Sequence, residues 1–599
     1  MKKNAINREL NNLYTRWGKE INKECPLAEY PRPQMKRESW VCLNGVWEYA
    51  IIDGKESTKP EKYDGEILVP FSPESLLSGV GRQLKPGQEL WYKRKIEFEN
   101  ISNDKKVLLH FGAVDQHCIV YLNGSEAGRH SGGYWPFMLD ITDLIILGEN
   151  SISVCVTDDS DLSNEAYGKQ KIERGGIWYT SQSGIWQTVW YEIVPKKHIE
   201  SIKITPMYRD SAVEIKVMGD ALSGIVHIKD GDKIVAQGTL ENGTSYISLP
   251  DFKSWSPESP FLYDVEITAG DDKVLSYFGM REFGISYEEN GYPMLLLNGN
   301  PIFHNGLLDQ GYWSDGMYTP PADEAMIWEI TQIKKMGFNM LRKHIKIEPL
   351  RWYYHCDRLG IIVWQDFVSG GGPYRDIMVK YAPWLGFKFS DTEKNYALHG
   401  RASKAGRDVF LRDAERTIDL LYNTVSLALW VPFNEGWGQF DSEKVCDMIK
   451  VMDPTRQIDH ASGYHDQGTG DLESYHIYYK RFRPKHKKNS DRVLALTEFG
   501  GYSLPIQHHM ASKKLFGYKI FKNRQELQNS IEGLYEKDVL PNISKGLGAI
   551  VYTQVSDVED EINGLFTYDR EIVKIDEKKM LEMNKKIFDA FENEVSNKH

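Results

Sequence analysis

The sequence LALWVPFNEGWG at residues 427–438 decides the fold prediction for this chain. It begins as an uninterrupted apolar run, typical of a parallel strand buried on both faces, and it ends on the carboxylate of Glu435. A second run of the same design, VLALTEFGG, covers residues 493–501 and carries Glu498 near its end. Two buried strands that each deliver a carboxylate at the carboxyl end indicate a (β/α)8 barrel with the pair at its mouth.

The sequence around these two runs has the alternation that a parallel barrel needs. From about Tyr292, apolar strands alternate with helical stretches. The eight predicted strands are FHNGLL (303–308), NMLRKH (339–344), IIVWQDF (361–367), SLALWVPFNE (426–435), QIDHASG (457–463), SYHIY (474–478), VLALTEFG (493–500) and AIVYTQVSD (549–557). The predicted helices are 323–336, 349–359, 406–422, 442–452 and 524–537. We expect Glu435 to end the fourth strand and Glu498 the seventh, with loops 368–400 and 499–522 at the pocket mouth.

Upstream of the barrel, the pattern is that of two antiparallel β-sandwiches. Short alternating strands with turn signals such as Asn123-Gly124 run from Trp40 to about Val194 and predict a jelly-roll sandwich. A second set of strands to about residue 288 predicts an Ig-like sandwich with no clustered catalytic side chains. The expected domains are 1–195, 196–288 and 289–599. The polar residues 1–30 are predicted to be a flexible or surface-draped lead.

Length and composition limit the class of protein. A chain of 599 residues is too long for one core. The net charge of −12, with no Lys/Arg block, argues against nucleic acid and membrane partners. The 6 cysteines show no metal-ligand spacing, so we expect buried free thiols. The start MKKNAINREL has no apolar segment and no run reaches about 18 apolar residues, which predicts a cytoplasmic protein.

A carboxylate pair at a barrel mouth fits glycosidic bond cleavage. With retention of configuration, that reaction needs two carboxyls about 5–5.5 Å apart, one protonated and one ionised. Glu435, beside Asn434 and Trp437, is predicted to be the general acid/base, with its pKa raised by repulsion from the second carboxylate. Asn434 is placed to hydrogen-bond the sugar 2-hydroxyl, and Glu498 is predicted to be the nucleophile. Taken alone, an Asn-Glu pair at a strand end also fits a helix cap.

The chain resembles glycoside hydrolase family 2, the β-galactosidase, β-glucuronidase and β-mannosidase family. The N-terminal likeness lies in RPQMKRESWVCLNGVWEY (32–49), YLNGSEAGRHSGGYWPFMLDIT (121–142) and SGIWQTVW (183–190). In the barrel it lies in GFNMLRKH (337–344), WVPFNEGWG and LTEFGG. The resemblance implies a jelly-roll domain, an Ig-like domain, a barrel and a retaining mechanism. It also supports Glu435 as acid/base and Glu498 as nucleophile.

Further site residues follow from the resemblance. It places sugar contacts at the ends of strands two, three, six and eight, namely Arg342, His344, Trp364, Gln365, Asp366, His476, Tyr478, Tyr552 and Gln554. The tyrosine of strand six is expected to hydrogen-bond the nucleophile, and strand eight to provide an aromatic platform under the sugar. Alternatives remain open, because Arg342 and His344 also fit a structural ion pair, and Asp366 also fits a partner of Arg342.

Departures from the family pattern bear on the sugar. β-Glucuronidases carry Asn-x-Lys after strand eight to bind the sugar carboxylate, whereas EINGLFTYDR (561–570) has Asn563 followed by Gly and Leu. A buried carboxylate needs a charged partner, so this absence argues against a uronic acid. Residue 345 is isoleucine where many members place a pocket histidine. The jelly-roll stretch 175–190 offers no carboxylate, which leaves Trp178 and Tyr179 as candidates for sugar stacking, with an aromatic core plug as the alternative.

The predicted function is therefore a retaining exo-glycosidase for a neutral β-linked sugar, with β-galactosidase first. The alternatives are a β-mannoside, β-glucuronide or arabinoside substrate with the same mechanism, or a non-catalytic carbohydrate-binding protein. No cofactor and no metal are expected, because the helix before strand four shows no Glu-x-His ligand pair. The expected partner is an oligosaccharide or glycoside substrate. The resemblance also implies a homo-oligomer, as relatives are often dimers or tetramers.

Overall fold

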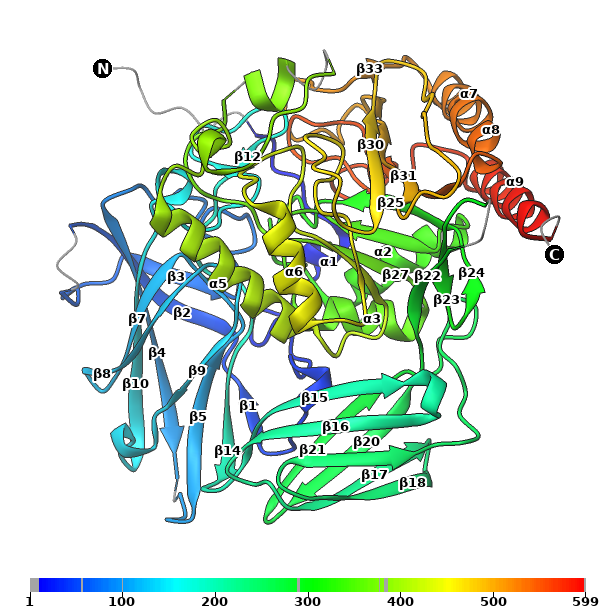
Figure 1. Ribbon diagram of the computed structural model, residues 1–599. Coiled ribbons are helices and arrows are strands. Elements are labelled where there is room, and N and C mark those ends of the chain that lie inside the picture. Colours follow the sequence, from blue (N-terminus) through cyan, green and yellow to red (C-terminus); the bar gives the residue numbers. More distant parts are fainter. Residues whose placement is uncertain are drawn as a thin grey trace.

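The structure is a computed structural model that describes residues 10–54, 58–99, 101–287, 291–375, 377–381 and 386–596. The chain forms two β-sandwiches and a barrel, which occupy separate regions of the molecule (Figure 1). The first sandwich lies at the left of the view, the second at the bottom and the barrel at the upper right. This is the jelly-roll, Ig-like and barrel architecture that the sequence predicts.

The jelly-roll sandwich has a six-stranded and a four-stranded sheet. In sheet order, the six strands are β3 (Gly65–Val69), β2 (Gly45–Asp53), β4 (Gln88–Phe98), β10 (Gly148–Thr157), β7 (His117–Leu122) and β8 (Ser125–Ser131). The four are β1 (Trp40–Cys42), β14 (Val189–Pro195), β5 (Lys105–Phe111) and β9 (Phe137–Asp140). Alternate side chains of the facing sheets form one apolar core, with Trp47 and Ile152 from the six-stranded sheet and Leu109 from the four-stranded sheet.

Short strands extend the jelly roll toward the barrel. They are β6 (Val114–Asp115), β11 (Gln170–Lys171), β12 (Tyr179–Thr180) and β13 (Gly184–Ile185). β11 and β12 pair in parallel, and the loop between them faces the barrel. Tyr179 of β12 donates a hydrogen bond to Glu561 of the barrel, and the Thr180 N–H donates to Glu559 (3.0 Å). The jelly roll is thereby anchored at the side chains that follow the last barrel strand.

The Ig-like sandwich packs against the opposite end of the barrel. Its sheets contain β15 (Ile199–Met207), β16 (Ala212–Gly219) and β19 (Thr244–Ser248), and β18 (Lys233–Leu240), β17 (Gly224–Asp230), β20 (Tyr263–Ala269) and β21 (Asp272–Phe278). The Trp255 indole donates to the carbonyl of Asp357 (2.7 Å), and Arg281 donates to the carbonyl of Val425 (3.0 Å). Both carbonyls lie just before barrel strands, so this sandwich covers the amino-terminal end of the barrel.

The barrel is an eight-stranded parallel sheet in which all eight predicted strands are present. In sheet order the strands are β29 (Gln457–Ile458), β28 (Leu427–Val431), β27 (Ile362–Asp366), β26 (Met340–Lys343), β25 (His304–Asp309), β34 (Leu547–Thr553), β31 (Val493–Gly500) and β30 (Leu472–Ile477). β29 and β30 are joined by side chains, since Ser474 Oγ donates to Asp459 Oδ1 (2.8 Å) and accepts from the Gly463 N–H (3.2 Å). A small sheet of β22 (Phe283–Ser286), β23 (Met294–Leu297) and β24 (Asn300–Pro301) leads into the barrel.

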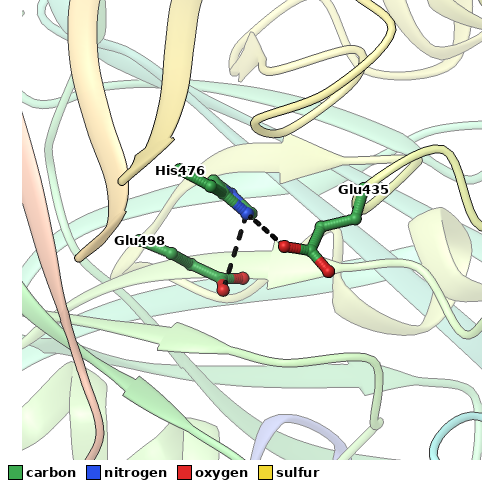
Figure 2. Close-up of side chains that lie close together, drawn as sticks. All are labelled: Glu435, His476 and Glu498. Atoms are coloured by element: carbon green, nitrogen blue, oxygen red, sulfur yellow. Dashed lines mark hydrogen bonds and ion pairs between the residues drawn. The ribbon is translucent and has the colours of Figure 1, made fainter. Parts of the chain in front are cut away.

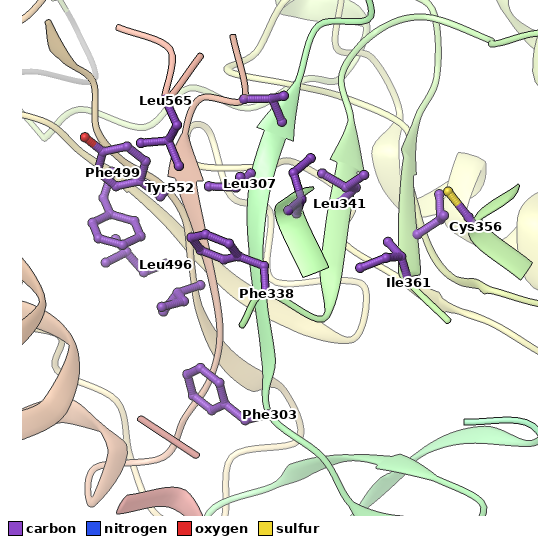
Figure 3. Packing of buried hydrophobic residues seen from close by; sticks show 14 of the residues in the cluster. Phe303, Leu307, Phe338, Leu341, Cys356, Ile361, Leu496, Phe499, Tyr552 and Leu565 are labelled. Atoms are coloured by element: carbon purple, nitrogen blue, oxygen red, sulfur yellow. The ribbon is translucent and has the colours of Figure 1, made fainter. Parts of the chain in front are cut away.

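Helices cover the outside of the barrel near the predicted positions. They are α2 (Asp323–Lys335), α3 (Leu350–Leu359), α5 (Lys404–Leu421), α6 (Ser442–Met452), α7 (Arg524–Leu534), α8 (Leu540–Ile543) and α9 (Glu577–Ser596). Figure 3 shows part of the core between strands and helices, where Leu307, Leu341 and Leu496 pack with Phe303 and Phe338. The strands β28 and β31 are buried along their whole length, as their apolar runs predict.

The lead from residue 10 onward is packed on the barrel, which fits the surface-draped alternative and not the flexible one. Thr15 is completely buried, and its N–H and hydroxyl both donate to Asp315 (2.8 Å each). The short helix α1 (Arg16–Lys19) follows, and Trp17 contacts Trp313 and Trp328 edge-on. Residues 1–9 lie outside the described residues.

Two further predictions concern cysteines and membrane spans. All six cysteines are free, and four of them are buried, namely Cys118, Cys155, Cys356 and Cys446. Among the described residues, no helix is both long enough and apolar enough to span a lipid bilayer.

Candidate active site

Glu435 lies on a tight turn beyond β28, whose last residue is Val431. Its φ of +51° is uncommon for a residue with a side chain, and Gly436 follows at +75°. The Glu435 N–H donates to the carbonyl of Ser462 (3.0 Å), and the Ser462 N–H donates to the carbonyl of Phe433 (2.9 Å). This backbone exchange with the end of strand five holds the turn and directs the Glu435 carboxyl into the barrel mouth.

Glu498 lies within β31 and is held by charged and polar donors. Arg342 Nη1, from β26, donates to Glu498 Oε1 (3.3 Å). The Tyr478 hydroxyl donates to Glu498 Oε2, as the family resemblance predicts. Tyr478 also lies 3.1 Å from Thr553 Oγ1 of β34. Donors from two neighbouring elements, Arg342 and Tyr478, therefore stabilise the ionised form of Glu498.

The two carboxylates face one another beside His476, which contacts both. His476 Nδ1 lies 2.9 Å from Glu435 Oε1 and 3.5 Å from Glu498 Oε2. These two contacts are the dashed lines in Figure 2. One oxygen of Glu435 and one of Glu498 lie within 4.8 Å of each other. The sequence predicted both carboxylates and His476 as site residues, but it did not predict that the histidine would contact both of them.

Burial is the main influence on the protonation of the pair. It raises the pKa of Glu435 to about 7, against the opposing charges of Lys169 and Arg342. The predicted cause, repulsion from Glu498, is therefore replaced by loss of solvent as the main one. Burial also raises the pKa of Glu498, while Arg342 and the Tyr478 hydroxyl act in the opposite direction. Burial lowers the pKa of His476 to about 4, so the imidazole is neutral at pH 7.

Arg342 organises the polar floor of the site. Its guanidinium binds Asp366 through two parallel hydrogen bonds (2.9 and 3.0 Å) and donates to Asn434 Oδ1 (2.8 Å). His344 Nδ1 lies 2.6 Å from the same Asp366 carboxylate. Asp366 is thus the structural partner of Arg342, which was the alternative assignment. Asn434 Nδ2 is buried with no hydrogen-bond partner among the described residues, so it remains a donor for a substrate hydroxyl.

The jelly roll contributes one wall of the pocket above the carboxylates. The pocket has a volume of about 460 Å³, and Gly175 to Trp178 of the loop after β11 line it. The Trp178 ring lies 5.1 Å from Trp437 and 6.1 Å from Tyr374. The sequence predicted sugar stacking or an aromatic core plug for this segment, and each describes part of it. Trp178 lines the pocket, whereas Tyr179 is completely buried.

The barrel loops contribute the other wall. Phe516 and Tyr518 come from the predicted loop 499–522, and Tyr374 comes from 368–400. The Tyr518 ring stacks on Tyr478 at 3.8 Å, with the ring planes 3° apart. Tyr464, beyond strand five, also lines the pocket and hydrogen-bonds Glu435. Sequence reasoning missed Tyr464 and Tyr518, because isolated tyrosines in long loops carry no spacing signal.

Two lysines of the jelly roll were also missed. Lys171 lines the pocket, and its Nζ lies 4.1 Å from the centre of the Trp178 ring. Lys169 is only 6% exposed, and its Nζ lies 5.2 Å from the Trp437 ring and 5.8 Å from the Tyr179 ring. The Lys169 carbonyl accepts from the Tyr179 N–H (3.0 Å), which holds the backbone, while the contacts of the ammonium in the described part of the chain are with these aromatic rings. The signal was present in the sequence as KQK just before the aromatic loop.

Four predicted substrate contacts lie away from the pocket. Gln365 accepts from the Tyr353 hydroxyl (2.6 Å) and donates to the carbonyl of Lys346 (2.8 Å). The Trp364 ring is completely buried in the barrel, and its indole donates to His304 Nδ1 (2.9 Å). Gln554 is held between Gln310 (2.9 Å) and Asn563 (2.7 Å). Tyr552 packs with Phe499 in the core outside the strands, visible in Figure 3. Neighbouring side chains on a strand point to opposite faces, so with Thr553 turned inward Tyr552 must turn outward.

The grouping of Glu435, His476 and Glu498 raises the question of a metal. Within the described ranges, this is the one place where three donor atoms of His, Cys or carboxylate side chains converge. The 2.9 Å contact between His476 and Glu435 is a hydrogen-bond distance. The grouping is explained by that bond, and we assign no metal to it. The expectation of no metal remains a prediction.

Comparison with known protein families agrees with this geometry. Residues 82–194 match the sugar binding domain of glycosyl hydrolases family 2, and residues 293–507 match the TIM barrel domain of the same family. Together these two segments span more than half of the chain. The protein belongs to glycoside hydrolase family 2.

Individual relatives carry more than one substrate name. A putative beta-glucuronidase of Formosa agariphila is 28% identical over 46% of this chain and 34% of its own length. A beta-galactosidase of Streptococcus thermophilus is 25% identical over 61% of this chain and 35% of its own length. The chain thus spans about a third of the length of these two curated relatives.

Solved structures share the fold over nearly the whole chain. A beta-glucuronidase from an uncultured Clostridium species superposes with a TM-score of 0.72, covering 93% of this chain and 99% of that one at 17% identity. A Ruminococcus gnavus beta-glucuronidase gives a TM-score of 0.73, covering 94% and 100% at 16% identity. At such identities the likeness establishes the three-part fold.

Proposed function

We propose that this protein is a retaining exo-glycosidase that cleaves a terminal β-linked sugar by double displacement. The observation that carries the proposal is the spacing of the two carboxylates, whose nearest oxygens lie within 4.8 Å. Retaining enzymes hold their carboxyls about 5–5.5 Å apart, whereas inverting enzymes leave about 6.5–9.5 Å for a water molecule. The spacing found here favours direct attack by one carboxylate on the anomeric carbon.

The surroundings of the two carboxylates support different roles. Glu498, bound by Arg342 and Tyr478, is the proposed nucleophile because its ionised form is stabilised. Glu435, whose pKa is raised by burial to about 7, is the proposed general acid for the leaving oxygen and then general base for the attacking water. The unpaired Asn434 amide is the proposed donor to the 2-hydroxyl.

For the sugar, we keep a β-galactoside as the first candidate, and Lys169 supports a uronide as the second. The sequence argument against a uronic acid was the missing cation after strand eight. The ammonium of the mostly buried Lys169 side chain contacts aromatic rings and is a cation that a substrate carboxylate would satisfy. Its place on the jelly roll would explain why the barrel motif lacks one.

A panel of nitrophenyl glycosides tests the proposal. Wild type, Glu498→Gln and Lys169→Met would be assayed on the β-galactoside, β-glucuronide, β-galacturonide, β-mannoside, β-glucoside and both arabinosides. We expect one strong signal that Glu498→Gln abolishes. A uronide signal that Lys169→Met lowers at least about tenfold, one unpaired charge being worth more than about 1.4 kcal/mol, identifies an acidic sugar. Turnover of a neutral sugar that is unchanged in Lys169→Met would exclude an acidic sugar as the substrate.

The same panel contains the test of the non-catalytic alternative. A folded wild-type protein that binds sugars in a direct binding assay, yet turns over none of the glycosides, would overturn the enzymatic proposal. We expect turnover, because Arg342 and Tyr478 hold Glu498 in the geometry of a nucleophile.

A further inference from the structure

His476 occupies a position beside the two carboxylates that neither proposed catalytic role explains. Its ring is held on both sides, with Nδ1 toward Glu435 and Nε2 at 3.1 Å from Ser462 Oγ. Gly463, with φ of +82°, makes room for the ring, because a Cβ there would lie 2.2 Å from His476 Cγ. The orientation of the imidazole is therefore fixed by the fold.

A chain of hydroxyls decides which ring nitrogen of His476 carries the hydrogen. The Thr497 hydroxyl donates to the carbonyl of Tyr475 (3.4 Å), and so it accepts from the Ser462 hydroxyl (2.9 Å). Ser462 has then used its only hydrogen and must accept from His476 Nε2. The neutral imidazole consequently bears its hydrogen on Nε2, and Nδ1 presents a lone pair to Glu435.

A lone pair facing a carboxyl oxygen at 2.9 Å makes a hydrogen bond only if that oxygen carries a proton. We propose that His476 is the proton-positioning residue of this site. Its Nδ1 accepts a hydrogen bond from protonated Glu435 and so keeps the acid/base carboxyl in its protonated form. This inference rests on the proposed glycosidase function. The histidine itself neither gains nor loses a proton during turnover.

The contact acts on both steps of the reaction. In the first step, Glu435 gives its proton to the leaving oxygen as the glycosidic bond breaks and Glu498 bonds to the anomeric carbon. Glu435 is then an anion facing the lone pair of His476, which is unfavourable. In the second step, water attacks the anomeric carbon, the bond to Glu498 breaks and the water proton returns to Glu435. His476 makes Glu435 a stronger base for that return, because it stabilises only the protonated form.

Other charged and titratable groups surround the pair and set the background for its titration. Those that face Glu435 from other elements are Lys169, Arg342, Tyr464, Tyr478, Glu498, Tyr518 and Glu561. Those that face His476 are Arg342, His344, Asp366, Asp459 and Glu498. His476→Phe leaves all of these groups in place. Ser462→Ala also removes a hydroxyl that interacts with Asp459, so the two variants are compared with each other.

Tyr464 offers a matched control of opposite sign. Its hydroxyl donates to Glu435, which stabilises the anion, whereas His476 accepts and stabilises the acid. His476→Phe should therefore move the basic limb of the pH profile of kcat/KM to lower pH by about one unit. Tyr464→Phe should move the same limb to higher pH. The substrate for both profiles is an alkyl glycoside of the sugar found with the panel, because its poor leaving group needs the proton.

Ser462→Ala tests the tautomer without removing the imidazole. The substitution keeps the backbone carbonyl that holds the Glu435 N–H. It frees His476 to carry its hydrogen on Nδ1 and donate to Glu435, so the basic limb should again move to lower pH. A uniform loss of activity in Ser462→Ala and His476→Phe, with the limb in place, would mean a merely structural role and overturn the inference. A limb that moves to higher pH would overturn it as well.

The inference can also be tested if no glycoside is turned over. Infrared difference spectra of wild type minus Glu435→Gln report the protonation of the Glu435 carboxyl directly. We expect the pH midpoint of the Glu435 titration to be lower in His476→Phe and Ser462→Ala than in the parent protein. An unchanged midpoint would reject the role of His476 whatever the panel shows, whereas a silent panel with a shifted midpoint would reject only the glycosidase proposal.

Discussion

The strands β28 and β31 share one sequence design, an apolar run followed by a glutamate, but the two glutamates lie in different chemical surroundings. At the β31 end, Glu498 stays within the strand and is bound by Arg342 and Tyr478. At the β28 end, Glu435 lies on a left-handed turn, and its contacts are a lone-pair acceptor and one hydroxyl. The pattern of apolar run plus glutamate places a carboxylate, and the neighbouring elements decide whether it serves as nucleophile or acid.

The largest effect is expected from removing the charge at the β31 end. Glu498→Gln keeps the size of the side chain but cannot attack the anomeric carbon, so kcat should fall by a factor on the order of 10⁴ or more. Steady-state rates on the best nitrophenyl glycoside measure this, with the thermal midpoint as a control for folding. Residual activity above about one hundredth of wild type would contradict the nucleophile assignment.

Removal of the carboxyl at the β28 end should give a loss that depends on the leaving group. Glu435→Ala removes the proton donor, which is worth about 10² to 10⁴ in rate where the leaving oxygen needs protonation. Alkyl glycosides should lose that much in kcat/KM, while dinitrophenyl glycosides lose far less in the first step. Equal losses on both substrates would contradict the assignment of Glu435 as the general acid/base.

The buried acid should also appear in the stability of the protein. Burial raises the pKa of Glu435 from 4.5 to about 7 in the fold, so its contribution is fully present below pH 4.5 and is lost as the pH rises through about 7. Glu435→Gln, which cannot ionise, should therefore be more stable than wild type at pH 8, by up to about 3 kcal/mol. The difference in thermal midpoint between the two proteins should vanish near pH 4. A difference independent of pH would refute the raised pKa.

The smallest effect should come from a single donor at the β31 end. Tyr478→Phe removes the hydroxyl that donates to Glu498 but leaves Arg342 in place. A hydrogen bond to a charged group is worth about 1.5–3 kcal/mol, so kcat/KM should fall about 10- to 100-fold, with the acidic limb of the profile moving to higher pH. Tyr518→Phe, which keeps the ring stacked on Tyr478, serves as the matched control and should leave that limb in place.

The sequence by itself determined the three-part fold, the eight barrel strands and the two glutamates proposed as catalytic. These follow from local patterns, because buried parallel strands need continuous apolar runs and parallel strands bring their carboxyl ends to one edge. Arg342 and Tyr478 were assigned through the family resemblance, and both donate to Glu498. Asn434 was assigned from its place beside Glu435, and it accepts from Arg342.

Only the tertiary structure decided how those side chains are used. The family resemblance assigned Tyr552 to the sugar, yet the direction of a strand side chain depends on register, and Tyr552 packs with Phe499 in the core outside the strands. Lys169 reaches the site from a separate sandwich, and the tautomer of His476 depends on Ser462 and Thr497 from two other strands. Burial, charge and hydrogen-bond direction arise from contacts between distant segments, and no local pattern encodes them.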